Sequence, residues 1–224
     1  MAEVVNHRGA LTLSPKGSLM SSRPLTGDPA TTAVVCVECQ NGVLGTESVL
    51  PNLTDECGGL VANIRRLLDA ARAADIRVVH ATFERLPGTN PRGSARLWRK
   101  LGPATSGWHP GTAPTQVIPE LLGPTDLVLP RHHGLFPTVG TELLPMLTDL
   151  GIKTVVLGGV SLNLALPHTA GDITQAGFGL VVPREAVGGT PAAYAEQVLA
   201  YSIAMLGQVT TVDEITAEWT ARER

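Results

Sequence analysis

The chain has 224 residues, of which 43% are hydrophobic, so it can bury a sizeable core without disulfides or structural metals. Its net charge of −3, with no run of Lys or Arg, argues against nucleic acid or an anionic membrane as the main partner. No stretch approaches the ~18 consecutive apolar residues of a membrane span, and the N-terminus lacks the pattern of a signal peptide. We therefore expect a soluble, cytoplasmic protein.

The three cysteines, Cys36, Cys39 and Cys57, are an odd number in a chain that needs no cross-links, which suits a reducing compartment. Cys36 and Cys39 form a C-x-x-C pair, but they lie within a strand-like run. Such a pair is more often two small packing residues than a redox or zinc pair, so we predict that both residues pack in the core.

Residues 1–29 show little hydrophobic periodicity and predict an irregular N-terminal arm, whereas residues 30–224 predict one α/β domain. Short apolar runs predict six strands, at residues 32–38, 76–82, 126–130, 153–157, 178–183 and 208–212. Each connection is long enough for a crossover, which predicts a parallel sheet with helices on both faces. The expected fold is a three-layer α/β/α, Rossmann-like domain with a six-stranded parallel sheet.

Several helices are predicted between these strands. Apolar residues with a 3.6-residue period predict a helix over residues 55–74. Thr141 is the expected N-cap of a helix that Gly151 ends. Thr190 is the expected N-cap of a later helix with Pro191 at its first position. That helix carries four large apolar side chains on one side, namely Tyr194, Val198, Tyr201 and Met205.

Residues 84–125 are the least regular part of the domain, with several prolines, two of the three tryptophans (Trp98 and Trp108) and a short predicted helix at 94–101. An excursion of this length in a compact domain usually has a function. We expect this segment to form a lid over the site or a contact between subunits.

The turn at residues 158–166 follows a buried strand and leads into a helix. In open α/β sheets the site lies outside the carboxyl ends of the strands, where the strand order reverses. The loops after the first, third and fourth strands should therefore meet, and they carry Glu38, the cluster that begins at Arg131, and this turn. Because the first N–H groups of a helix have no partner within it, the turn should hold negative charge.

These segments resemble one family. Residues 34–41 (Val-Val-Cys-Val-Glu-Cys-Gln-Asn) resemble the first-strand motif of the isochorismatase-like (cysteine hydrolase) superfamily, whose usual form ends in Asp-Met-Gln-Asn. Residues 159–165 resemble its nucleophile segment, and residues 134–143 are similar to the segment after its catalytic lysine. The resemblance runs over residues 32–212 with all elements in order, and it implies the isochorismatase-like hydrolase fold.

The resemblance implies a catalytic triad of aspartate, lysine and cysteine, and each member differs here. Glu38 stands at the position of the aspartate, Arg131 is the nearest match for the lysine, and Ala165 stands at the position of the cysteine. Alanine cannot act as a nucleophile, so thiol catalysis at this position is excluded. Glu38 and Arg131 then form either a structural ion pair or the acid–base and anion-binding groups of a reaction without a thiol.

The loop after the third strand also carries His132 and His133. At most one of two adjacent side chains should face the pocket, where it could act as a general acid or base; an exposed or capping role is the alternative. The pair could bind a metal ion with Glu38, but no third ligand is visible, so we expect neither a metal nor another cofactor.

Further candidates for substrate contacts lie in and near the turn. The resemblance implies a cis peptide between Val160 and Ser161, and Ser161 is expected to shape the backbone because no base is near to activate it. Asn163 is the expected N-cap of the following helix with a substrate contact, and the N–H groups near Leu164 and Ala165 are the expected anion site. Two residues outside the turn, Phe136 and Gln40, complete the set of expected contacts.

Two functions remain open. The first is a hydrolase of this family that acts on a small polar molecule, either an amide or a vinyl ether cleaved by acid catalysis, as isochorismatase members of the family do without the cysteine. The second is a non-catalytic member whose pocket binds a small molecule or a partner. A scaffold whose pocket is filled by side chains is a third, less favoured alternative. The resemblance also implies a homo-oligomer, a dimer or larger.

Overall fold

The computed structural model describes residues 24–89 and 94–222. Its centre is a parallel sheet, as the alternating pattern predicts. The strands are β1 (Thr32–Val37), β2 (Arg77–Phe83), β3 (Leu127–Arg131), β4 (Thr154–Val160), β5 (Gly179–Pro183), β6 (Val187–Gly188) and β7 (Gln208–Thr210). The six expected strands are all present. The two-residue β6 was missed because so short a pairing has no hydrophobic pattern of its own.

The order of the strands places the site. The sheet runs β3-β2-β1-β4-β5-β7, and β6 pairs with β4 beyond the end of β5. The chain therefore moves outward in opposite directions from β1 and from β4, and the order reverses between these two strands. A crevice at their carboxyl ends is the predicted place for a ligand in such a sheet.

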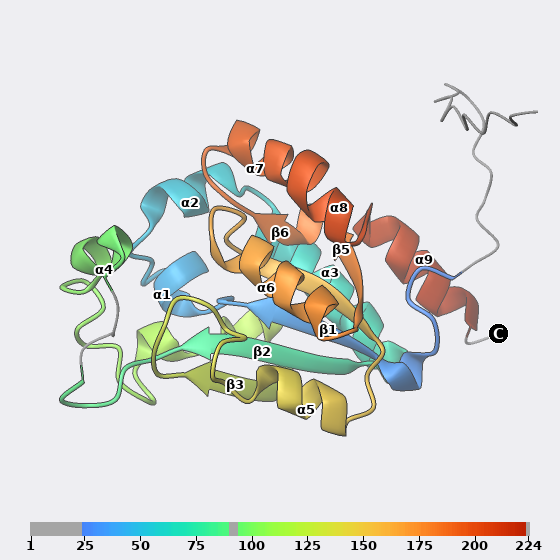
Figure 1. Ribbon diagram of the computed structural model, residues 1–224, viewed down its shortest axis with the longest axis horizontal. Helices are drawn as coiled ribbons and strands as arrows, with labels where there is room; N and C mark the ends of the chain where they lie inside the picture. The colour runs from blue at the N-terminus through green and yellow to red at the C-terminus, as the bar shows by residue number, and fades with distance from the viewer. Residues whose placement is uncertain (1–23, 90–93, 223–224) are drawn as a thin grey trace, which may run out of the picture.

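The helices nearest the site are short. The helices are α1 (Asn41–Leu44), α2 (Pro51–Glu56), α3 (Leu60–Ala73), α4 (Arg96–Leu101), α5 (Leu143–Asp149), α6 (Ala165–Gln175), α7 (Ala192–Val198), α8 (Ala204–Leu206) and α9 (Val212–Arg222). Figure 1 shows α1, α2 and α4 at the end of the sheet toward which the strands point. The predicted helix at residues 55–74 is α3, which begins five residues later than expected.

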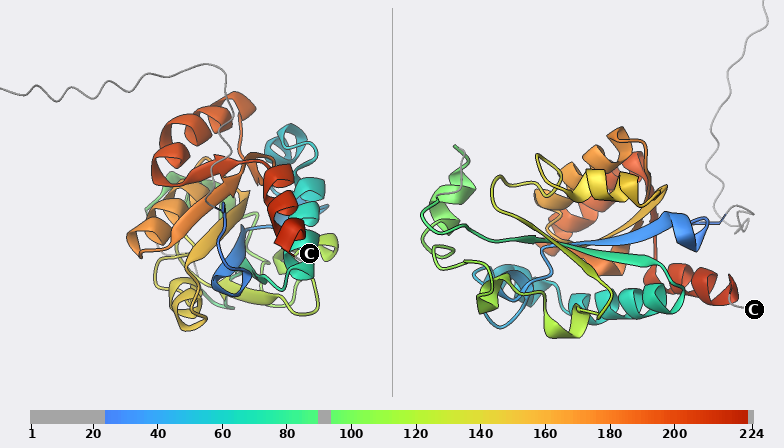
Figure 2. Two further views of the ribbon diagram at one scale, coloured as in Figure 1. Left: turned by 90° about the vertical axis from the view of Figure 1, so that its right-hand side faces the viewer. Right: turned by 90° about the horizontal axis from the view of Figure 1, so that it is seen from below.

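The two faces of the sheet are covered by different helices, as Figure 2 shows in its right-hand view. One face packs against α3 and α9 around residues such as Ile64 and Trp219. The other face packs against α5, α6 and α7 around residues such as Leu147 and Leu166. The strands of the centre are therefore buried on both sides, which explains the unbroken apolar run of β1.

Two expectations for the helix after Thr190 were wrong. Pro191, not Thr190, is the N-cap of α7, and the Thr190–Pro191 peptide is cis. A π-helical turn at Leu199–Ile203 follows α7, so the straight 3.6-residue period does not hold. Of the four residues expected on one side, Val198 is buried, whereas Tyr194, Tyr201 and Met205 are exposed. The buried side of this segment is formed by Ala195, Val198, Leu199 and Ile203.

Residues 25 and 26, at the end of the expected N-terminal arm, pack against α9. The backbone N–H groups of Leu25 and Thr26 donate hydrogen bonds to the carboxylate of Glu218. The indole N–H of Trp219 donates to the Thr26 hydroxyl, 2.9 Å away. Residues 1–23 lie outside the described residues. Within the described ranges, no helix is both long enough and apolar enough to cross a membrane.

Candidate active site

Glu38 follows the last residue of β1 and turns the chain out of the sheet. Its φ of 54° lies in the left-handed region, which is uncommon for a residue with a side chain. Its N–H donates to the carbonyl of Ala81 on β2, 2.9 Å away, which holds the turn in place. The strand thus ends at Val37, one residue earlier than predicted, and the Glu38 side chain faces the end of the sheet.

Arg131 ends β3 and pairs with Glu38, as the meeting of the strand ends predicts. Its Nη2 donates to Oε1 of Glu38, and its Nε donates to the carbonyl of Gly134 at 3.4 Å. The guanidinium also lies over the ring of Phe83, with Cζ 4.9 Å from the ring centroid. The side chain of Arg131 is only 4% exposed and that of Glu38 is 19% exposed, so the pair is largely withdrawn from water.

The side-chain amide of Gln40 binds the backbone of Phe83. Its amide nitrogen donates to the carbonyls of Phe83 and Pro114, and its amide oxygen accepts from the N–H of Phe83 at 2.8 Å. Gln40 is fully buried, so these bonds replace those that water would make. The predicted contact of Gln40 with a substrate is therefore wrong. Its side chain instead fixes the backbone of Phe83, the residue whose ring contacts Arg131.

The turn between β4 and α6 has the predicted position. The Val160–Ser161 peptide is cis, as the resemblance implies. The N–H groups of Leu164 and Leu166 both donate to the carbonyl of Ser161, at 3.2 and 3.0 Å. Within residues 24–89 and 94–222, the N–H of Ala165 has no acceptor. Of the two amides expected to bind an anion, only that of Ala165 is thus free to do so.

Asn163 does not cap α6, contrary to expectation. The N-cap is Leu164, and no side chain bonds the helix start. The Asn163 amide instead makes two hydrogen bonds to the backbone of Thr190, donating to its carbonyl and accepting from its N–H. These bonds join the β4–α6 turn to the loop before α7, a contact 27 residues away in sequence that local spacing could not predict.

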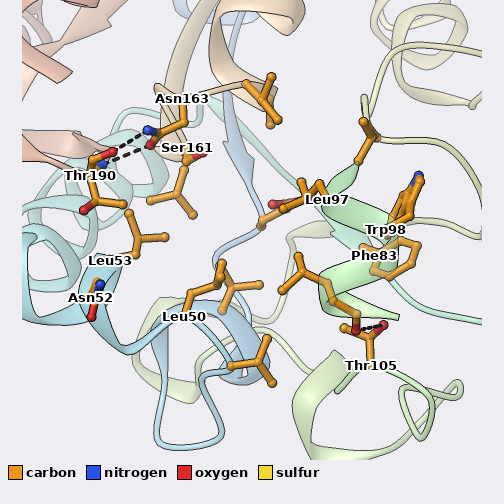
Figure 3. A pocket seen from close by; sticks show the side chains of 18 of the residues that line it. Leu50, Asn52, Leu53, Phe83, Leu97, Trp98, Thr105, Ser161, Asn163 and Thr190 are labelled. Atoms are coloured by element: carbon orange, nitrogen blue, oxygen red, sulfur yellow. Dashed lines mark hydrogen bonds between the residues drawn. The ribbon is translucent and has the colours of Figure 1, made fainter. Parts of the chain in front are cut away.

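These segments enclose a cavity of about 470 Å³ at the carboxyl ends of β1 and β4. Seven of the eleven site residues predicted from the sequence line it, namely Glu38, Arg131, Val160, Ser161, Asn163, Leu164 and Ala165. Figure 3 shows further lining residues, Asn52 and Leu53 of α2 and Leu97 and Trp98 of α4, around Ser161 and Asn163. The cavity is open space beside Ala165, and Glu38 is paired with Arg131 at its edge.

The two histidines and Phe136 do not line this cavity. His132 lies against Glu84, with Nδ1 3.4 Å from Oε1, and His133 is exposed. Phe136 stacks on the ring of His168 with centroids 3.9 Å apart. The expectation that one histidine faces the pocket is therefore wrong in this structure. The described residues contain no group of three His, Cys, Asp or Glu side chains placed to hold a metal ion.

All three cysteines of the chain lie in the described part, and none of them lines the cavity. Cys36 and Cys39 are buried in the hydrophobic core, in agreement with the prediction. A hydrogen bond with Cys36, together with burial, raises the pKa of the Cys39 thiol well above its usual value. A raised pKa leaves little reactive thiolate, which suits a packing role.

Most of the apolar residues that line the cavity have no distinguishing signal in the sequence. Phe83 ends β2, Leu53 lies on α2, and Leu97 and Leu101 lie on α4; all four line the cavity. Each looks like an ordinary core residue in the sequence, so only their common position reveals them. Trp98 and Trp108, which lie in the segment expected to form a lid or a subunit contact, also line the cavity.

The fold and the strand-end site match a known family. The Isochorismatase domain matches residues 32–214 of the chain. The chain belongs to the isochorismatase family. Membership agrees with the resemblance of the first-strand and turn motifs and places the protein among hydrolases.

Relatives within the isochorismatase family include enzymes named for amide cleavage. Ureidoacrylate amidohydrolase RutB of Agrobacterium fabrum is 27% identical over 224 residues, covering 85% of this chain and 91% of that protein. N-carbamoylsarcosine amidase of an Arthrobacter species is 28% identical over 137 residues, covering 58% of this chain and 49% of that protein. The crystal structure of a cysteine hydrolase from Pseudomonas syringae pv. phaseolicola has a TM-score of 0.73 at 20% identity, covering 90% of this chain and 99% of that one.

Proposed function

We propose that this isochorismatase-family protein hydrolyses an amide without a thiol nucleophile, with Glu38 as the general base. The observation that carries the proposal is an open cavity in which a carboxylate meets a guanidinium and which no cysteine lines. The amidohydrolase and amidase names of the relatives support the amide as the bond that is cleaved.

In the proposed reaction Glu38 activates a water molecule. Arg131 donates to Oε1, and within the described residues Oε2 has no hydrogen-bond partner, so it can accept a proton from water. The resulting hydroxide attacks the amide carbon, and the C–O bond forms. The C–N bond then breaks, and the leaving nitrogen takes the proton from Glu38. Because Arg131 uses Glu38 as an acceptor, the geometry favours a base over an acid that protonates a vinyl ether.

The N–H of Ala165 would stabilise the charge that develops on the carbonyl oxygen. It has no acceptor in the described chain, and Ala165 lines the cavity as the first residue of α6. Fixed donors of this kind act strongly in a site that excludes water. The alanine at this position also leaves room for a water molecule where a thiol would stand.

The Glu38–Arg131 pair also favours a second function, in which the pocket binds a ligand without turnover. A carboxylate paired with a buried guanidinium can have a purely structural role. The presence of the pair therefore does not require a reaction. The open cavity agrees with either function and argues against the scaffold with a filled pocket.

Ammonia release from primary amides separates the two functions. We expect slow release from 3-phenylpropanamide by the unchanged protein and loss of that release in Glu38→Gln, which keeps the size of the side chain. Glu196→Gln, at an exposed carboxylate outside the cavity, is the matched control and should keep full activity. Undiminished release by the Glu38→Gln protein would remove Glu38 from the mechanism, and calorimetric binding without any release would favour the non-catalytic function.

A further inference from the structure

The two sides of the cavity differ in chemical character. Figure 3 shows Ser161, Asn163, Thr190 and Asn52 on one side, with Leu53 among them, and Phe83, Trp98 and Leu97 on the other. We refer to these sides as the polar wall and the apolar wall. The apolar wall is continued by Leu101 and Trp108.

The apolar wall is preformed. The rings of Phe83 and Trp98 lie 5.4 Å apart at an interplanar angle of 40°, and those of Phe83 and Trp108 lie 6.2 Å apart at 51°. Tilted aromatic pairs at these distances attract one another beyond simple burial. Because Gln40 also holds the backbone of Phe83, a ligand meets an ordered aromatic surface and need not order it on binding.

Only part of the polar wall can bind a ligand. The Asn163 amide is used by the backbone of Thr190, and the Thr190 hydroxyl donates to Oε1 of Glu56 at 2.9 Å. The side chains of Ser161 and Asn52 have no hydrogen-bond partner in the ranges that the structure describes. Hydrogen bonds to a ligand can therefore come from these two side chains.

The charges of the cavity balance each other. Among the described residues that line it, Glu38 and Arg131 are the charged ones, and they are paired through Nη2 of Arg131, while Nη1 is buried without a hydrogen-bond partner. An anion bound to Nη1 would lie beside the Glu38 carboxylate, and a cation would have to compete with Arg131 for Glu38, so a net charge of either sign is costly in this largely apolar space. A neutral ligand has neither cost.

We propose that the pocket selects neutral molecules in which a hydrogen-bonding group, such as a primary amide, is joined to an aromatic or branched aliphatic body. The amide lies toward Ser161 and Asn52, and the apolar body lies against Phe83, Trp98 and Leu97. This assignment deepens the proposed function, since it rests on the amide lying beside Glu38. The sequence predicts only a small polar substrate, and the proposal narrows this class to neutral molecules with an apolar body.

The size of the cavity agrees with this class of ligand. A volume of about 470 Å³ lies within the roughly 300–1,000 Å³ of small-molecule pockets. It corresponds to about sixteen water molecules at roughly 30 Å³ each. An amide with a short carbon chain would leave water in most of that space, in contact with the aromatic side chains. A phenylalkyl body would displace this water.

Calorimetric titration of the full chain with primary amides tests the proposal. From propanamide to hexanamide, each added methylene should strengthen binding about fourfold, as ~0.8 kcal/mol per buried methylene implies. At equal length, 3-phenylpropanamide should bind at least about tenfold more tightly than 3-phenylpropanoate or 3-phenylpropylamine. Affinities that do not change with chain length, or a charged analogue that binds more tightly than the amide, would overturn it.

Variants of the apolar wall locate the binding. Leu97→Gln and Leu101→Gln, at half-buried positions on α4, should each weaken 3-phenylpropanamide about tenfold and leave propanamide nearly unchanged. Leu122→Gln, at a 46% exposed leucine outside the cavity, is the matched control and should change neither. Equal effects of the wall and control variants would contradict the assignment.

The outcome for Glu38→Gln keeps this proposal separate from the proposed function. Glu38→Gln does not alter the apolar wall, so it should bind 3-phenylpropanamide within about threefold of the unchanged protein. If binding follows chain length but Glu38→Gln loses no turnover, the ligand class stands and the base assignment fails. If turnover depends on Glu38 but affinity does not change with the apolar body, the proposed ligand class is wrong and the assignment of Glu38 as the base stands.

Discussion

The guanidinium of Arg131 donates to the carboxylate of Glu38 and lies over the ring of Phe83, with Cζ 4.9 Å from the ring centroid. Arg131→Met should therefore leave a carboxylate that is only 19% exposed without its partner, and we expect the free energy of unfolding to fall by about 2–4 kcal/mol. Combining it with Glu38→Gln should recover part of this loss. Urea denaturation of the single and double variants measures the coupling.

The exposed pair of Arg184 and Glu196 provides the control for this cycle. Its atoms are 3.5 Å apart, and the two side chains are 48% and 65% exposed. Arg184→Met should change stability by less than about 1 kcal/mol. A loss of similar size at both sites would mean that burial does not strengthen the Glu38–Arg131 pair.

Removing the Gln40 side chain should be costly although it lies outside the cavity. Gln40→Ala leaves the N–H and carbonyl of Phe83 and the carbonyl of Pro114 without these hydrogen bonds. We expect a loss of about 2–4 kcal/mol in urea denaturation. Gln175→Ala, at an exposed glutamine, should change stability by less than about 0.5 kcal/mol. A neutral Gln40→Ala would show that water replaces the amide.

Two glycines should respond to alanine in opposite ways. At Gly159, φ is +99° and an added Cβ would lie 2.2 Å from the carbonyl oxygen of Val37, so Gly159→Ala should disrupt the β1–β4 contact and cost more than about 3 kcal/mol. At Gly171, within α6, an added Cβ meets nothing within 4 Å. Gly171→Ala should stabilise by roughly 0.5–1 kcal/mol. Thermal unfolding by circular dichroism distinguishes the two.

The buried carboxyl of Asp126 should make stability depend on pH. Burial raises its pKa, but hydrogen bonds from His80, Arg72 and the amide of Gly123 outweigh burial and hold the pKa well below its usual range. As pH falls, the unfolded chain therefore takes up the proton first, so the stabilisation is complete above about pH 5 and is lost progressively below about pH 4.

Asp126→Asn measures this contribution. We expect a loss of about 3 kcal/mol in the free energy of unfolding at pH 7 and a smaller difference from the unchanged protein at pH 3. Asp149→Asn, at an exposed residue, should have little effect at either pH. A difference that grows toward acid would reverse the sign and contradict the assignment.

Restoring a thiol tests whether the rest of the site is assembled. Ala165→Cys places a sulfur in the cavity at the start of α6. We expect ammonia release from 3-phenylpropanamide to rise by roughly 10²-fold, because a nucleophile and a base then act together. Ala165→Ser is the matched control and should show no such rise. Alkylation of the new thiol without any gain in release would mean that Glu38 and the turn are misplaced for amide cleavage.

The core of the site could be predicted because parallel strands end at one edge of a sheet. Glu38, Arg131 and the 158–166 turn meet there, and each follows an apolar run that is visible in the sequence. Gln40 and Asn163 were assigned to the wrong partners for a physical reason. Their amides bind backbone 43 and 27 residues away, and no local spacing encodes such contacts.

Phe83 and Leu97 of the apolar wall could not be predicted, because they are chemically indistinguishable from core residues until the chain has folded. The exposed Tyr201 shows the converse case. Its spacing from Tyr194, Val198 and Met205 suggests a common buried helix face, but of these four only Val198 is buried. Ala195, Leu199 and Ile203 take the other buried positions of α7 and the π-helical turn after it. Periodicity identifies a helix reliably and its buried face less so.

The three tryptophans report on two different parts of the molecule by their fluorescence. Trp98 and Trp108 line the cavity beside Phe83, whereas Trp219 lies on α9 in the core, with its indole N–H bonded to Thr26. A ligand should quench the fluorescence of Trp98 and Trp108. Loosening of residues 24–29 should shift the emission of Trp219 to the red, and this is a separate signal. Emission spectra of Trp219→Phe and of the Trp98→Phe/Trp108→Phe double variant can therefore follow occupancy of the pocket and attachment of the N-terminal segment separately.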